Sequence, residues 1–228
     1  MKREVYEVTY DEVAFEVQFG DDATCLREAW RKNGALHREN GPAVTLSNPE
    51  WAQYLRKEWH KNGKLHRDDD EPAVITTNMY GTLRQHWYKN GKLHREGDEP
   101  ATLEIHPDSG IHSYSGWYKN GMLHRELGPA WITRDDCTGV SFEEFWYKDG
   151  VLHRPTSKEG ILQPAAIFRD DRTGVIEVEL FYLNGELQKY GQSRGRLREH
   201  ETGRIMTDDE CKDFIEWPAE PPRMYTVF

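Results

Sequence analysis

A segment of nine residues recurs five times along the 228-residue chain at a nearly constant interval. Its third copy reads Trp-Tyr-Lys-Asn-Gly-Lys-Leu-His-Arg, and successive copies begin 29, 28, 30 and 29 residues apart, at Trp30, Trp59, Trp87, Trp117 and Trp146. A Pro-Ala pair follows each copy, and a decayed sixth copy from Phe181 lacks the His-Arg pair. A fixed interval of this length predicts an array in which each unit packs on its neighbours.

The centre of each copy predicts a tight β-hairpin. Asn-Gly or Asp-Gly between two short runs favours a two-residue type I′ turn, because both of its residues need a positive φ. With such a turn in the fourth copy, Lys119 pairs with Met122, Tyr118 with Leu123, and Trp117 with His124. Side chains alternate between the faces of a strand, so Trp and His share one face while Tyr and Leu share the other.

A second turn in each unit completes an antiparallel meander. Turn-rich clusters at residues 107–110, 135–139 and 170–174 separate further β-like runs. The fold class is therefore predicted to be all-β, with repeated antiparallel hairpins forming an elongated meander or solenoid. The stretch between each His-Arg pair and the next proline cannot continue one straight strand. We expect a bulge, a small loop or a corner into a second sheet layer there.

The two ends differ from the repeats and are predicted to act as caps. Alternating apolar residues at Tyr6–Tyr10 and Val13–Phe19 predict a hairpin within an N-terminal β cap at residues 1–23. The array of six units occupies residues 24–191. In the C-terminal cap, residues 192–228, a capping box at Thr207–Glu210 predicts a short helix ending near Glu216.

Composition narrows the class of protein. The net charge of −10 argues against direct nucleic-acid binding and favours a partner with a basic surface. No apolar run approaches the roughly 18 residues of a membrane span, and no secretory signal follows Met1, so we expect a cytoplasmic protein without membrane contact. Three cysteines at unrelated spacings, Cys25, Cys137 and Cys211, predict reduced thiols.

No residue pattern predicts catalysis, and we expect no cofactor. The five repeated histidines invite a metal hypothesis, but equivalent residues in successive units lie about 9.5 Å apart, from the spacing of two strands. Zinc needs four ligands within roughly 2.3 Å of one point. We therefore expect neither a metal site nor catalytic residues. These histidines are His37, His66, His94, His124 and His153.

Two sets of side chains are candidate binding residues. The first is the row of repeated tryptophans, Trp30, Trp59, Trp87, Trp117 and Trp146, which either covers the sheet or forms an exposed aromatic strip. The second set consists of acids in the loops and turns, which we expect on an edge away from the lysines of the Asn-Gly hairpins. These acids are Asp68, Asp69, Asp70, Glu71, Asp135, Asp136, Asp170 and Asp171.

The Trp-Tyr-x-Asn-Gly-x-Leu hairpins resemble the variant class of MORN-type repeats. The longer unit, Trp-Tyr-Lys-Asn-Gly-x-Leu-His-Arg-Glu-x-Gly-Pro-Ala, is similar to repeat proteins of phages, large DNA viruses and bacteria. The resemblance covers residues 24–191. The likeness to MORN-type repeats implies a hairpin-repeat scaffold, with lipid contact in some proteins of that type. The likeness to phage and viral repeat proteins implies a phage-type inhibitor in the host cytoplasm.

The leading functional hypothesis is a non-enzymatic acidic repeat protein that docks on another protein. It would block a host nucleic-acid-binding or defence system, either by occlusion or by imitating the phosphates of DNA. One alternative is binding of single-stranded nucleic acid or carbohydrate by the tryptophan row. Another is a structural or assembly scaffold whose activity is self-association. The oligomeric state is left open.

Overall fold

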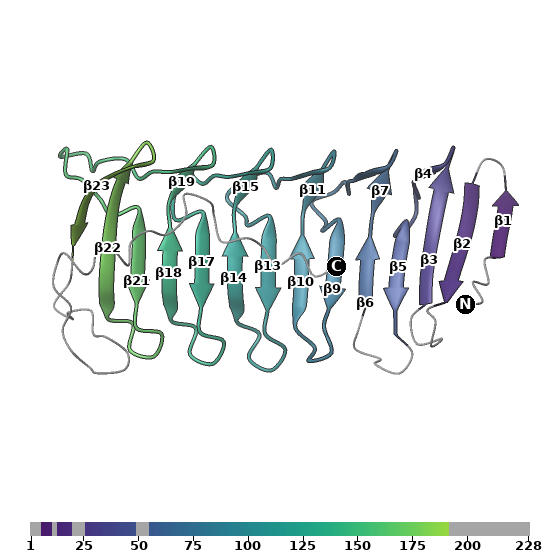
Figure 1. The fold of residues 1–228 in the computed structure, drawn as a ribbon, viewed down its shortest axis with the longest axis horizontal. Helices are drawn as coiled ribbons and strands as arrows, with labels where there is room; N and C mark the ends of the chain where they lie inside the picture. Colours follow the sequence, from purple (N-terminus) through teal and green to yellow (C-terminus); the bar gives the residue numbers. More distant parts are fainter. Residues whose placement is uncertain (1–5, 11–12, 20–25, 49–54, 192–228) are drawn as a thin grey trace.

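The computed structural model describes residues 6–10, 13–19, 26–48 and 55–191, and every regular element among them is a β-strand. One long antiparallel sheet of fifteen strands dominates the structure, with its strands in chain order as Figure 1 shows. The all-β class and the antiparallel hairpin meander are thereby confirmed. The helix expected from Thr207, together with Cys25 and Cys211, lies outside the described residues. No helix among the described residues has the length and apolarity needed to span a membrane.

The main sheet follows the meander that the sequence predicts, beginning with the expected N-terminal hairpin of β1 and β2. Its strands are β1 (Tyr6–Tyr10), β2 (Val13–Phe19), β3 (Leu26–Lys32), β4 (Ala35–Leu36), β5 (Val44–Ser47), β6 (Leu55–Glu58), β9 (Val74–Thr77), β10 (Leu83–His86), β13 (Thr102–Ile105), β14 (His112–Gly116), β17 (Trp131–Arg134), β18 (Ser141–Phe145), β21 (Ala166–Arg169), β22 (Ile176–Leu183) and β23 (Glu186–Gly191). The division into two caps and an array stays a prediction.

Four of the Asn-Gly or Asp-Gly hairpins form separate two-stranded sheets, which we call the repeat hairpins. Residues Asn120 and Gly121 have φ of 54° and 89°, as a type I′ turn requires. The predicted pairs Tyr118–Leu123 and Lys119–Met122 are confirmed. The repeat hairpins are β7 (His60–Lys61) with β8 (Lys64–Leu65), β11 (Tyr88–Lys89) with β12 (Lys92–Leu93), β15 (Tyr118–Lys119) with β16 (Met122–Leu123), and β19 (Tyr147–Lys148) with β20 (Val151–Leu152).

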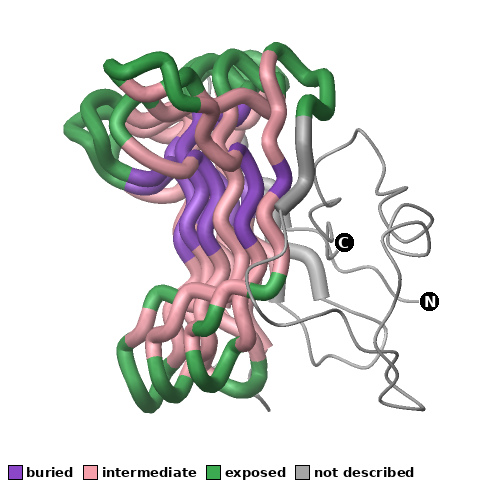
Figure 2. The backbone as a smooth tube through the Cα atoms, turned by 90° about the vertical axis from the view of Figure 1, so that its left-hand side faces the viewer, coloured by how far each residue is buried: buried purple, intermediate pink, exposed green. Residues whose placement is uncertain are grey.

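The repeated tryptophan marks a corner where the chain leaves the main sheet. Trp87 lies between β10 and β11 and donates its backbone N–H to the carbonyl of Ala101, 2.8 Å away. The repeat hairpin then turns out of the plane of the sheet, as Figure 2 shows for the segments at its top left. Of the three arrangements left open by the sequence, the structure has a corner followed by a loop that returns through the proline to the next strand.

The repeat hairpins stack on one another in a row along one edge of the main sheet (Figures 1 and 2). The turn glycine of each repeat donates its N–H to the leucine carbonyl of the preceding repeat, as from Gly121 to Leu93 at 2.8 Å. The same bond joins Gly150 to Leu123 and Gly185 to Leu152. Each repeat is therefore bonded to the next through the hairpins as well as through the sheet.

A bulge near the opposite turn corrects the simplest expected register. A tight hairpin closed by residues 107–110 would place Thr102 opposite Ser115, but Thr102 faces Gly116. The register shifts between Glu104, which faces Tyr114, and Ile105, which faces His112, so Ser113 is the extra residue. Such a bulge lets the strand twist without breaking the sheet.

The core lies at the corners, where the repeat hairpins join the main sheet. Trp87, Leu93, Trp117, Tyr118, Leu123 and Trp131 are buried in one cluster, with Tyr88, Tyr114, Phe145 and Tyr147 packed against it. The alanines of the Pro-Ala pairs are fully inaccessible to solvent. The alanines concerned are Ala43, Ala73, Ala101, Ala130 and Ala165.

Gly116 is expected to tolerate no side chain. A Cβ there would lie 2.5 Å from the Tyr114 hydroxyl, 2.8 Å from Thr102 Oγ1 and 3.0 Å from Tyr118 Cε2. We expect Gly116→Ala to lower the free energy of unfolding by about 2 kcal/mol, the usual cost of overpacking a core. Urea unfolding measures this value, and adding Tyr114→Phe should recover part of it by removing the nearest atom. An alanine variant as stable as the parent would contradict the packing described for this corner.

Candidate functional site

Each repeated tryptophan carries an arginine of its own repeat on its ring. The guanidinium carbon lies 3.8–4.3 Å from the ring centroid in all five pairs. Trp87 and Trp117 are buried, and the other three are half-buried. One face of every ring is therefore already occupied by a cation, which leaves little of this row for stacking a base or a sugar. The pairs are Trp30–Arg38, Trp59–Arg67, Trp87–Arg95, Trp117–Arg125 and Trp146–Arg154.

Each of these arginines also binds the backbone of the proline that follows it in the chain. In every repeat Nη1 donates a hydrogen bond of 3.0–3.3 Å to the proline carbonyl that precedes the buried alanine. The stack and the bond together fix the returning loop on the tryptophan. The acceptors are the carbonyls of Pro42, Pro72, Pro100, Pro129 and Pro164.

Two of the arginines also bind a carboxylate from the preceding repeat. Arg95 donates from Nε and Nη2 to the two oxygens of Asp70, at 2.9 and 2.8 Å. Arg125 binds Asp98 in the same bidentate way, at 2.8 Å for each bond. These hydrogen bonds lower the pKa of both aspartates. Asp98 lies in an acidic run from Glu96 to Glu99 but was not among the candidate binding acids, although it stands two residues before a proline, as Asp70 does.

The repeated histidines join neighbouring repeats rather than one common centre. Nδ1 of each histidine accepts the backbone N–H of the turn Asn or Asp in the next repeat, at 3.1 Å. In a neutral ring with this bond alone on Nδ1, the proton sits on Nε2, which is free to donate. The Nδ1 of His124 differs, because it also lies 2.8 Å from the Asp149 carboxylate. The bonds run from Asn62 to His37, Asn90 to His66, Asn120 to His94, Asp149 to His124 and Asn184 to His153.

In the second and third repeats the acid that follows the His-Arg pair binds the histidine Nε2 together with a lysine. In the second repeat Asp68 binds His66 Nε2 at 2.9 Å and Lys61 at 3.3 Å. In the third, Glu96 receives Lys89 at 2.9 Å and His94 at 3.0 Å, and these bonds lower the pKa of Glu96 to about 2. The loop acids therefore share the edge of the hairpin lysines, contrary to the expected separation of the two charges.

The four candidate acids at residues 68–71, in the loop of the second repeat, consequently have different roles. Asp68 and Asp70 hold cations of the framework, as described above. Asp69 is exposed and has a left-handed φ of 60°, and Glu71 lies 3.6 Å from Arg67. This run is thus largely engaged within the protein.

The other candidate acids lie in turns at the opposite edge of the main sheet. We call residues 106–111, 135–140 and 170–175 the aspartate turns; they follow β13, β17 and β21 along the lower edge in Figure 1. Asp135 accepts bonds from the backbone and hydroxyl of Thr138, and Asp170 does the same with Thr173. These bonds lower the pKa of both aspartates. Asp135 and Asp170 therefore shape their turns.

The remaining acids of the aspartate turns are accessible. Asp108 and Asp171 are exposed, and half of the Asp136 side chain reaches solvent. Neighbouring turns touch, because the Ser109 hydroxyl donates to the backbone carbonyl of Asp136 at 2.6 Å. The structure thus brings these carboxylates together as one acidic edge.

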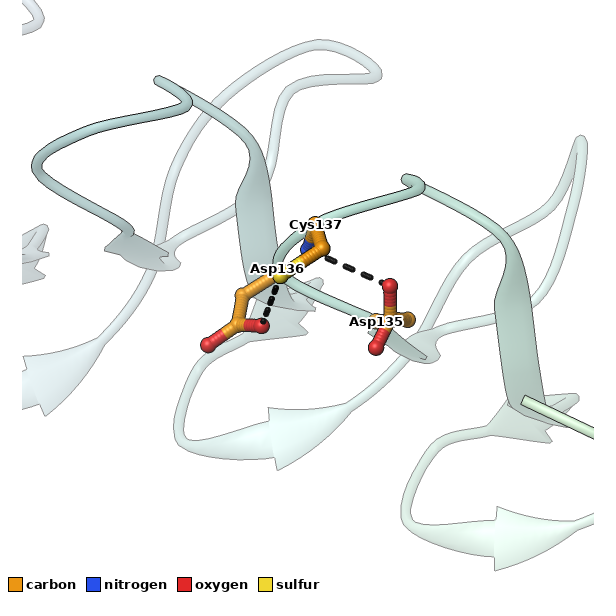
Figure 3. A group of neighbouring side chains, drawn as sticks. All are labelled: Asp135, Asp136 and Cys137. Carbon is orange, nitrogen blue, oxygen red and sulfur yellow. Dashed lines mark hydrogen bonds between the residues drawn. The ribbon is translucent and has the colours of Figure 1, made fainter. Parts of the chain in front are cut away.

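The second aspartate turn also holds the exposed thiol of Cys137, shown in Figure 3 with Asp135 and Asp136. The Asp136 carboxylate, 3.5 Å from Sγ, raises the pKa of Cys137 and so disfavours the reactive thiolate. His106 lies 3.6 Å from Asp136 and 3.3 Å from the Ser109 hydroxyl. That hydroxyl gives its proton to a backbone carbonyl, so the three residues do not form an activated nucleophile.

A shallow groove of about 330 Å³ lies between the loops of the third and fourth repeats. Four of its charged or titratable lining residues are already paired, since Arg125 binds Asp98 and Glu96 binds His94. We therefore assign it no ligand. Comparison of the sequence with protein-family models and with curated proteins finds no match.

Proposed function

We propose that this chain is a non-enzymatic repeat scaffold that binds a partner protein with a basic surface through its aspartate turns. One observation carries the proposal: the recurring Trp, Arg, His and Asn groups bond to one another, whereas Asp108, Asp136 and Asp171 stay accessible on one edge. The overall charge of −10 favours the same kind of partner. The resemblance of the repeat to phage proteins supports a host protein as that partner.

Charge density favours occlusion over close imitation of DNA. Two strands separate successive aspartate turns, so about two carboxylates recur every 9 to 10 Å along the edge. Duplex DNA carries one charge per roughly 1.7 Å of its axis, which is about three times denser. The acidic edge would therefore attract a basic surface and cover it, without reproducing the phosphate pattern.

Neutralising the accessible aspartates tests the proposal. We expect the triple variant Asp108→Asn, Asp136→Asn, Asp171→Asn to capture several-fold less of its basic partner from a host lysate than the parent. Capture by the parent should fall when salt rises from about 0.1 M to 1 M, because the Debye length shrinks from roughly 10 to 3 Å. Affinity purification followed by mass spectrometry measures both effects. Asp135 and Asp170 are left intact because they shape their turns.

A matched control carries the same change in charge on the hairpin side. The triple variant Asp69→Asn, Glu99→Gln, Glu186→Gln neutralises three exposed acids outside the aspartate turns. It should capture the partner like the parent does. Equal loss in both triple variants, or capture indifferent to salt, would rule out the aspartate turns as the binding edge.

A further inference from the structure

The fifth repeat keeps the cationic groups of the earlier repeats but lacks the acids that hold them. In the second and third repeats a lysine and a histidine converge on one carboxylate, from Asp68 or Glu96. The fifth repeat has the same hairpin, with Lys148 paired to Val151 and the His153 N–H bonded to the Trp146 carbonyl at 2.9 Å. The acid's place in the chain, two residues after the histidine, is taken by Pro155.

This replacement leaves a carboxylate position open. His153 Nδ1 accepts the N–H of Asn184 at 3.1 Å, so the neutral ring presents its proton on Nε2. Lys148 is exposed beside it on the same hairpin. Within the described part of the chain, no carboxylate lies within ion-pair distance of either group.

Arg154 lacks its acid for a separate reason. It stacks on Trp146 at 4.0 Å and donates Nη1 to Pro164 at 3.0 Å, as Arg95 and Arg125 do with their own partners. The loop of the preceding repeat, Glu126-Leu127-Gly128, is one residue shorter than Glu96-Gly97-Asp98-Glu99 and has no aspartate before its proline. Among the described residues, Nε and Nη2 of Arg154 therefore hold no carboxylate.

The surroundings of Arg154 do not replace the missing aspartate. Glu144 and Glu179, both in the main sheet, favour the charged form of Arg154 through their negative charges. Glu144, however, is already paired with Arg169 at 3.1 Å. Burial lowers the pKa of Arg154, as expected for a half-buried guanidinium without a bonded acid.

We propose that the fifth repeat binds an acidic segment of a partner protein, with one carboxylate held by Lys148 and His153 and another by the Nε–Nη2 edge of Arg154. The chain itself supplies the precedent, because Glu96 and Asp98 occupy the corresponding positions one or two repeats earlier. Bidentate Arg–carboxylate bonds are strong and directional. This site is distinct from the aspartate turns and is opposite in charge, so it goes beyond the function proposed above.

The surface around the site favours a protein over a nucleic acid. Leu127, from the shortened loop, and Ile161, from the insertion after Arg154, are 82% and 64% exposed. Val151, on the hairpin itself, is 44% exposed. Exposed apolar side chains on the hairpin of Lys148, and on the loops that precede and follow that hairpin in the chain, suit a partner segment in which acidic and apolar residues alternate. The net charge of −10 repels a long polyanion.

Restoring the missing acid provides the test. The probe is a short fluorescein-labelled peptide rich in Asp and Leu, and its binding is followed by fluorescence anisotropy. We expect Pro155→Glu to weaken binding about tenfold or more, because the new carboxylate occupies Lys148 and His153. The variant should unfold at the same urea concentration as the parent or a higher one, which separates loss of binding from loss of fold. Grafting residues 96–99 in place of 126–128 should weaken binding through Arg154 in the same way.

The opposite experiment removes the acids that bind the cationic groups of another repeat and is expected to create a peptide site there. The double variant Glu96→Ala, Asp70→Asn frees Lys89, His94 and the Nε–Nη2 edge of Arg95, and we expect it to add a second peptide site, visible as a higher stoichiometry. A peptide with Asn in place of Asp should not bind. The proposal is overturned if the acidic peptide does not bind the parent, if Pro155→Glu binds it equally well, or if a single-stranded oligonucleotide or inorganic phosphate displaces it at lower concentration than unlabelled peptide does.

Discussion

Replacing Arg95 by alanine is expected to lower the free energy of unfolding by about 3 kcal/mol. The substitution removes the guanidinium that stacks 4.1 Å from the centroid of the buried Trp87 ring, a contact worth up to about 2 kcal/mol when desolvated. It also leaves the carbonyl of buried Pro100 without its donor, which costs about 1–3 kcal/mol. Because each repeat is stabilised by its neighbours, the loss weakens the array on both sides.

Urea unfolding followed by far-UV circular dichroism measures this loss, and Asp70 provides the matched comparison. The Asp70 side chain is 58% exposed, so Asp70→Asn should cost less than about 1 kcal/mol, as exposed ion pairs do. The double variant then gives the coupling between the two residues. If Asp70→Asn proved as costly as Arg95→Ala, the ion pair and not the tryptophan stack would be the main contribution of Arg95.

The hairpins were predictable residue by residue because their geometry is local. Asn and Gly readily take the positive φ seen at Asn120 and Gly121, and a two-residue turn then determines that Tyr118 faces Leu123. The interval between copies is equally informative, since a nearly constant spacing of 28 to 30 residues indicates an array of similar units. The order of strands in the sheet follows from these two facts and from the second turn of each unit.

The corner at each tryptophan was not predictable, because it depends on a bond between distant residues. Trp87 leaves the sheet where its N–H bonds to Ala101, and the spacing of residues alone does not distinguish this corner from a bulge or a loop. The extra residue Ser113 has the same character, since a bulge is invisible in a pattern of alternating side chains. In both cases the local sequence allows several backbone paths, and contacts between distant residues decide which path forms.

The roles of some candidate acids depend on distant partners, whereas the roles of others can be predicted from neighbouring residues. Residues 68–71 look like one acidic run in the sequence, but Asp70 pairs with an arginine 25 residues later while Asp68 pairs within its own repeat. The aspartates at 135 and 170 reveal their turn role locally, through the Thr three residues on. Positions that depart from the repeat are also informative about candidate binding sites. Pro155, which stands where other repeats have an acid, is one such position.

Acidification is expected to destabilise the protein through His86. This residue, in β10, faces Val74 and Thr102 in the register of the sheet, and its Nδ1 is buried without a hydrogen-bond partner. Burial, with the positive charges of Arg56 and Arg84, lowers its pKa from 6.5 to about 4. Glu58, which faces Val74 from the other side, is bonded to Arg56 and His60 and offers His86 no compensating contact.

The sign and size of this effect follow from proton linkage. Between pH 6.5 and 4 the unfolded chain protonates His86 and the folded chain does not, so the free energy of unfolding falls as the pH falls and the loss is complete near pH 4. A difference of about 2.5 units corresponds to roughly 3 kcal/mol. His86→Gln, which cannot titrate, should lose correspondingly less stability between pH 7 and 4 in urea titrations. An identical pH dependence in the parent and this variant would show that His86 is solvated or compensated in the folded protein.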